Sequence, residues 1–76
     1  MMDAIKKAVQ EGASDNHKIA TFHLEILRHA QELEGMNPEE VCKELAVPIT
    51  YATEFRKMLS LARLMKERGI RLVEPT

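Results

Sequence analysis

Residues 37–55, NPEEVCKELAVPITYATEF, carry the clearest local signals in the chain and predict a short helix, a tight turn and a second helix. Asn37 is a strong N-cap residue, because its side-chain oxygen can accept a hydrogen bond from a free backbone N–H of the first turn. Pro38 then occupies the first helical position, where its missing N–H costs nothing. Glu40 lies three residues after the cap, near the helix end where the dipole favours negative charge. We therefore expect a helix to begin at residue 38.

Pro48 separates this helix from the next one. Proline cannot continue a helix and biases the preceding residue, Val47, away from helical angles. The first helix is therefore expected over residues 38–46. Thr50 is the expected N-cap of the second helix, which should run over residues 51–68.

The order of apolar and small residues across the two helices resembles the bihelical core of the helix-turn-helix DNA-binding superfamily. In that core, a small residue lets the two helices cross closely and apolar residues fill the crossing. The residues that carry the resemblance are Val41, Cys42, Leu45, Ala46, Val47, Ala52 and Phe55. The resemblance implies that the start of the second helix enters the major groove of DNA.

Two residues of this pattern carry expectations of their own. Ala46 occupies the turn position often held by glycine, and a left-handed backbone at alanine would cost about 1–2 kcal/mol. The sequence therefore predicts a turn of a different shape. Cys42 is expected to be a small core residue rather than a reactive thiol, because no histidine lies close to it in the sequence.

The other segments complete an all-α prediction, a small four-helix domain with a long C-terminal helix and a short extended tail. The expected helices are 3–11, 17–34, 38–46 and 51–68, and the tail is 70–76, all within one domain. Gly12 should end the first helix. Asp15 or Asn16 should cap the second, and apolar residues at three- and four-residue steps should form its buried stripe.

The length of 76 residues, with 45% hydrophobic residues and one cysteine, bounds the class of protein. A chain of this size buries only about 60% of its unfolded surface, so dimerisation would be a natural source of stability. A single cysteine excludes an internal disulfide. Neither a signal peptide nor an apolar run of membrane-spanning length is apparent, which favours a cytosolic protein.

Basic side chains are concentrated in residues 56–71, which hold six cations and one carboxylate. This local charge of +5, in a chain of net charge −1, leaves −6 for the other residues. Such asymmetry can orient a partner, although a solvated helix surface would account for it equally well. The near-neutral total differs from the basic balance that is typical of nucleic-acid-binding domains.

The first functional hypothesis is a small DNA-binding protein, a dimeric transcription regulator that reads the major groove with the start of the second helix. Thr50 and Thr53 can bond phosphates or bases, whereas Glu54 can accept from a cytosine amino group but repels phosphates. The expected contact set is Thr50, Tyr51, Thr53, Glu54, Arg56, Lys57 and, on the first helix of the motif, Lys43.

Leu61, Leu64 and Met65 are apolar residues of the last helix that exceed what a monomer needs. They are expected either to contact a second copy or another partner, or to be covered by the first helix. The alternative function is therefore a protein–protein interaction module that uses the helix-turn-helix and the apolar last helix, as an accessory protein does when it docks on a larger assembly.

Catalysis is not expected, because no Gly-rich phosphate loop, nucleophile–base pair or metal-ligand cluster is apparent. The three histidines, His17, His23 and His29, are spaced by six residues. Six residues turn a helix by about 240°, so neighbouring histidines do not share a face as a metal pair would. Neither a metal nor a cofactor is expected.

Overall fold

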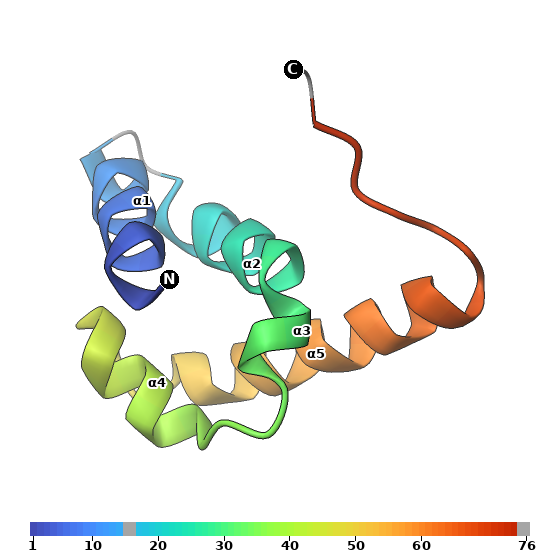
Figure 1. Ribbon diagram of the computed structural model, residues 1–76. Helices are drawn as coiled ribbons and strands as arrows, with labels where there is room; N and C mark the ends of the chain where they lie inside the picture. Colours follow the sequence, from blue (N-terminus) through green and yellow to red (C-terminus); the bar gives the residue numbers. More distant parts are fainter. Residues whose placement is uncertain (15–16, 75–76) are drawn as a thin grey trace.

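Five helices form the fold in the computed structural model, which describes residues 1–14 and 17–74. They are α1 (Met2–Ser14), α2 (Lys18–Arg28), α3 (Ala30–Leu33), α4 (Pro38–Leu45) and α5 (Tyr51–Glu67). An extended tail, residues 70–74, follows α5 and bends away from its end (Figure 1). The predicted all-α class is confirmed, and no strand occurs in the described ranges.

The helices pack around one apolar cluster. Helix α1 contacts α2 and α4, whereas α5 contacts α2, α3 and α4 (Figure 1). Helix α5, the second helix of the motif, therefore packs on both α4, the first helix of the motif, and α2. None of the helices in the described part of the chain is long and apolar enough to cross a membrane.

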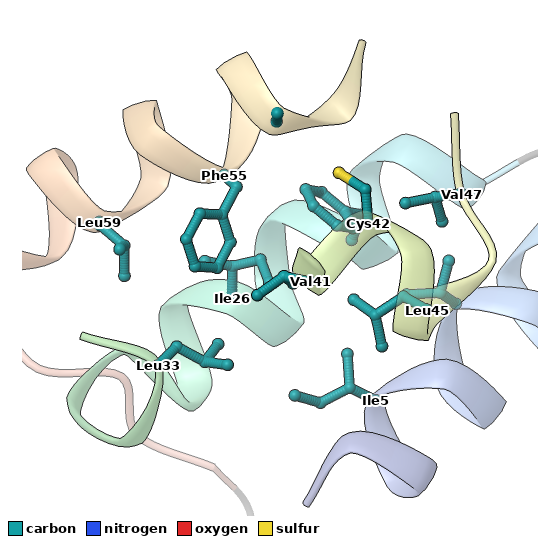
Figure 2. Close-up of a cluster of buried hydrophobic side chains, with 12 residues drawn as sticks. Ile5, Ile26, Leu33, Val41, Cys42, Leu45, Val47, Phe55 and Leu59 are labelled. Carbon is teal, nitrogen blue, oxygen red and sulfur yellow. The ribbon is translucent and has the colours of Figure 1, made fainter. Parts of the chain in front are cut away.

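The second predicted helix, residues 17–34, is divided in two at His29, so the expectation of one continuous helix was wrong. His29 adopts φ −109° and ψ 20°, outside helical values. The break redirects the chain, and the short α3 then places Leu33, which is fully buried, in the core near Ile26 (Figure 2). Burial of a leucine side chain contributes about 1.5–3 kcal/mol, which offsets the distorted turn. The expected caps of this helix, Asp15 and Asn16, lie outside the described residues.

Gly12 does not end the first helix, contrary to expectation, because α1 continues to Ser14. The residue instead permits close packing of α1 on α2. A Cβ atom at position 12 would lie 2.4 Å from the Thr21 Oγ1 atom and 2.9 Å from its Cβ atom. The backbone N–H of His17 also donates to the Gly12 carbonyl oxygen at 2.8 Å. Glycine is thus required here for space rather than for termination.

The helix-turn-helix begins as predicted and turns in a way that was not predicted. Asn37 caps α4, since its Oδ1 atom accepts from the backbone N–H groups of Glu39 at 2.9 Å and Glu40 at 3.2 Å. Ala46 adopts the left-handed conformation, with φ 56° and ψ 43°, so the expected change of turn shape was wrong. The N–H of Ala46 donates to the Lys43 carbonyl at 3.2 Å, and that of Val47 donates to the Cys42 carbonyl at 3.1 Å. This Schellman pattern satisfies the Cys42 and Lys43 carbonyls in the last turn of α4 and offsets the strain at alanine.

Thr50 precedes α5 but does not cap it through its side chain. Its backbone is helical, with φ −59° and ψ −22°, and its hydroxyl makes no capping hydrogen bond. The helix starts instead through backbone bonds, from Tyr51 N–H to the Pro48 carbonyl and from Ala52 N–H to the Ile49 carbonyl, both 2.9 Å. The predicted N-cap role of Thr50 was therefore wrong, because the preceding turn already supplies acceptors for these N–H groups.

Six of the seven residues that carry the helix-turn-helix pattern lie in the core, and the exception is the exposed turn residue Ala46. Phe55 points from α5 into the apolar cluster, toward Ile26 and Val41 (Figure 2). Cys42 is only 1% exposed, and burial raises the pKa of its thiol. Its predicted role as a small core residue is confirmed.

Candidate nucleic-acid interface

The start of α5 presents polar side chains on the face opposite its buried residues. Ala52, Phe55 and Leu59 are buried against the other helices. Thr53 and Lys57 are exposed, and successive residues of a helix are separated by about 100°, which places these two on the far side of α5. The side chain of Lys57 is 62% exposed. These two residues therefore form the centre of the candidate surface.

The cations predicted beside this centre are also exposed, on two helices. Lys43 lies on α4, and Arg56 lies on α5. Arg56 lines the same shallow hollow as Pro38, at the start of α4. Its positive charge lowers the pKa of Cys42 and so partly opposes the effect of burial on that thiol. Arg56 thus lies on the side of α5 that faces α4.

Tyr51 is half-buried because its ring packs on α2. Its centroid lies 4.9 Å from that of Phe22, with the planes at 70°. The Lys18 Nζ atom lies 5.9 Å from the Tyr51 ring centroid, on its face. An edge-to-face aromatic pair of this kind fixes the angle between two elements, so α2 determines how the first turn of α5 is presented.

Glu54 is held on both of its oxygens. The His23 Nε2 atom lies 2.8 Å from Oε1, and the Lys57 Nζ atom donates to Oε2 at 3.2 Å. These bonds, that of His23 first, lower the pKa of the Glu54 carboxyl. The carboxylate therefore stays ionised, but much of its capacity to accept hydrogen bonds is already used within the protein.

Lys18 and His23 are candidate site residues that sequence analysis missed. Both lie on α2, which is distant in sequence from α5, and they reach the site only because the two helices pack together. The side chain of His23 is 32% exposed. Nothing in the sequence, however, indicated its pairing with Glu54.

The predicted partner surface lies toward the other end of α5. Leu61 and Leu64 are 39% and 44% exposed, whereas Met65 is half-buried. Met65 lines an open groove of about 730 Å³ between α2, α3, α5 and the tail. Helix α1 makes no contact with α5 in the described ranges, so the alternative that the first helix covers these residues was wrong.

The tail lies along the same groove and is tied to α2. The Arg28 Nε atom lies 2.5 Å from the Glu74 Oε1 atom, and the Arg28 Nη1 atom lies 2.8 Å from the buried Glu25 carboxylate. Arg63 pairs with Glu34 of the turn that follows α3. Arg63, one of the cations of α5, is thus neutralised on this side of the helix.

Comparison with known proteins extends the sequence resemblance to nearly the whole chain. A family described as an HTH-like domain, where HTH stands for helix-turn-helix, matches residues 1–68. This match includes all five helices and leaves out the tail. No curated protein and no solved structure is significantly similar to the chain. The protein is a helix-turn-helix protein and belongs to the HTH-like domain family.

Proposed function

We propose that the protein binds duplex DNA, with the start of α5 in the major groove, and acts as a dimeric transcriptional regulator. The observation that carries the proposal is the placement of Thr53 and Lys57 on the exposed face of the second motif helix, opposite Phe55. Residues at this place in a helix-turn-helix contact base edges and phosphates. Thr50, which is exposed and has no capping bond, extends the same surface.

The proposed phosphate contacts come from both sides of this surface. Lys57 and Arg56 lie on α5, and Lys43 lies on α4. Lys18 lies on α2, with its ammonium group over the ring of Tyr51. Each cation that neutralises a phosphate releases a condensed counterion, so affinity should fall as the salt concentration rises. With four cations, one copy should bind weakly, and two copies on neighbouring half-sites would bind more tightly.

Fluorescence anisotropy with random-sequence duplex DNA, at about 50 and about 200 mM salt, tests the proposal. We expect binding at the lower concentration that weakens steeply at the higher one. Thr53→Glu should abolish binding, because it places a carboxylate against the DNA. Ser60→Glu adds the same charge two turns further along α5 and serves as the control. Absence of binding by the wild-type protein at the lower concentration would refute DNA binding.

The proposed dimer would use Leu61, Leu64 and Met65. Leu61 and Leu64 are about two-fifths exposed, and they lie toward the end of α5 remote from the DNA-facing residues. Sedimentation velocity measures the oligomeric state directly. Leu64→Glu should give a monomer, whereas Ile19→Glu, at a similarly exposed apolar residue of α2, should not. A wild-type monomer at high concentration would refute the dimer.

A second candidate function, a protein–protein interaction module without enzymatic activity, is favoured by the same exposed leucines. An apolar helix face of this kind can accept the apolar anchors of a partner helix. Under this function, the wild-type protein would give a flat anisotropy signal with DNA and would sediment as a monomer. Thr53→Glu would then be neutral, and Leu64→Glu would be the variant that loses the interaction.

A further inference from the structure

The side chain of Glu54 presents a difficulty for DNA binding. It is the only carboxylate among residues 51–57, the part of α5 that holds the proposed DNA contacts. An unpaired carboxylate a few ångströms from a phosphate is repelled by it. The position of this group should therefore affect how closely the helix approaches DNA.

His23 determines where that carboxylate lies. Its Nε2 atom is 2.8 Å from Glu54 Oε1, across the contact between α2 and α5. With the proton on Nε2, the imidazole donates and draws the carboxylate toward α2. The side chains of both residues are about 30% exposed, at 32% and 28%, so the bond forms at the edge of the helix contact rather than in the core.

The ring of Phe22, the residue next to His23, adds a second contact between the same two helices. Its contact with Tyr51, at 4.9 Å between centroids, fixes the first turn of α5 relative to α2. Lys57 completes the set from within α5, at 3.2 Å from the second carboxylate oxygen. An ammonium group has three donors, so Lys57 can keep this bond and still contact a phosphate.

We propose that His23 is a positioning residue for the DNA-facing surface, because it holds the Glu54 carboxylate toward α2 and leaves Thr53 and Lys57 to face the DNA. The inference rests on the proposed DNA binding and deepens it by adding a residue from outside the helix-turn-helix. Glu54 acts in this arrangement as an internal acceptor rather than as a reader of cytosine. Without His23, its carboxylate would be free to turn toward the phosphates and to bind Lys57 alone.

The experiment measures the dissociation constant for duplex DNA by anisotropy in four proteins: the wild type, His23→Leu, Glu54→Gln and the double variant. His23→Leu should weaken binding about fivefold, the size expected for one unpaired charge near a phosphate. Glu54→Gln should bind at least as tightly as the wild type, since it removes the repelling charge. In that background, His23→Leu should have no further effect, because the residue acts only through Glu54.

Two controls separate positioning from a general loss of structure. His23→Gln keeps an N–H donor that can reach the carboxylate and should bind DNA within about twofold of the wild type. Glu67→Gln removes a carboxylate from the far end of α5 and should not rescue His23→Leu. Rescue of His23→Leu by Glu54→Gln, and not by Glu67→Gln, is the readout that a purely structural role of the imidazole would not produce.

The outcomes distinguish this inference from the function on which it rests. Equal weakening by His23→Leu in the wild-type and Glu54→Gln backgrounds would overturn the inference and leave DNA binding intact. An unchanged dissociation constant for His23→Leu would do the same. If the wild type itself fails to bind DNA, the proposed function and the inference are both refuted. Should His23→Leu unfold, the dissociation constants of His23→Gln, Glu54→Gln and the wild type are compared instead. Weaker DNA binding by a natively folded His23→Gln would then overturn the inference.

Discussion

The ring of Phe22 packs edge-on against that of Tyr51, with the centroids 4.9 Å apart and the planes at 70°. Phe22 is fully buried on α2, and Tyr51 is the first residue of α5. This contact joins α2 to the first turn of α5, the helix proposed to face DNA. The orientation of that helix therefore depends on residues that lie outside the helix-turn-helix.

Replacing Tyr51 with leucine should destabilise the fold while keeping an apolar side chain in place. The aromatic pair contributes about 0.5–1.5 kcal/mol beyond the area it buries, and the variant loses it. Urea denaturation followed by circular dichroism measures the free energy of unfolding. Thr53→Leu, on the exposed face of the same helix, should change it by less than about 0.5 kcal/mol. An equal effect of the two substitutions would contradict a specific role of the ring pair.

Gly12→Ala should also destabilise the fold, although alanine is the better helix former. The new methyl group would lie 2.4 Å from Thr21 Oγ1 and 2.9 Å from its Cβ atom, so α1 and α2 must separate. Overpacking of this kind costs about 1–3 kcal/mol, more than the gain in helix propensity. A lower melting temperature is expected, and Thr21→Ala in the same chain should restore part of it. A higher melting temperature of the single variant would show that the helices can part easily.

Ala46→Gly should stabilise the protein, because the residue adopts φ 56° and its side chain is exposed. Removing the Cβ atom relieves about 1–2 kcal/mol of left-handed strain, and the greater freedom of glycine in the unfolded chain takes back about half. A net gain of about 0.5–1 kcal/mol is expected in urea denaturation. Ala20→Gly, at an exposed helical position of α2, should lose about 1 kcal/mol. If both glycine substitutions changed the free energy of unfolding in the same direction, the left-handed turn at Ala46 would be contradicted.

Sequence reasoning predicted the local features of the motif and missed the contacts between distant segments. Asn37 and Pro38 predict the start of α4, because capping depends only on residues within one turn. The break at His29 has no proline or glycine to mark it. It is stabilised by the burial of Leu33 in a core to which residues distant in the sequence contribute. The pairing of His23 with Glu54 was likewise hidden, because 31 residues separate them and only the packing of α2 on α5 brings them together.

Glu54 also makes the stability of the fold depend on pH in a definite direction. Its folded pKa is lowered from the ordinary value of 4.5, first by the bond from His23 and then by that from Lys57. The contribution of these bonds is therefore complete above pH 4.5 and is lost as the pH falls through the lower, folded pKa. Carbon-detected NMR titration of the Glu54 carboxyl should give a midpoint below the ordinary value, and His23→Leu should raise it. A midpoint that does not move in His23→Leu would mean that the imidazole does not stabilise the ionised carboxylate. It would also remove the physical basis on which His23 is proposed to position Glu54.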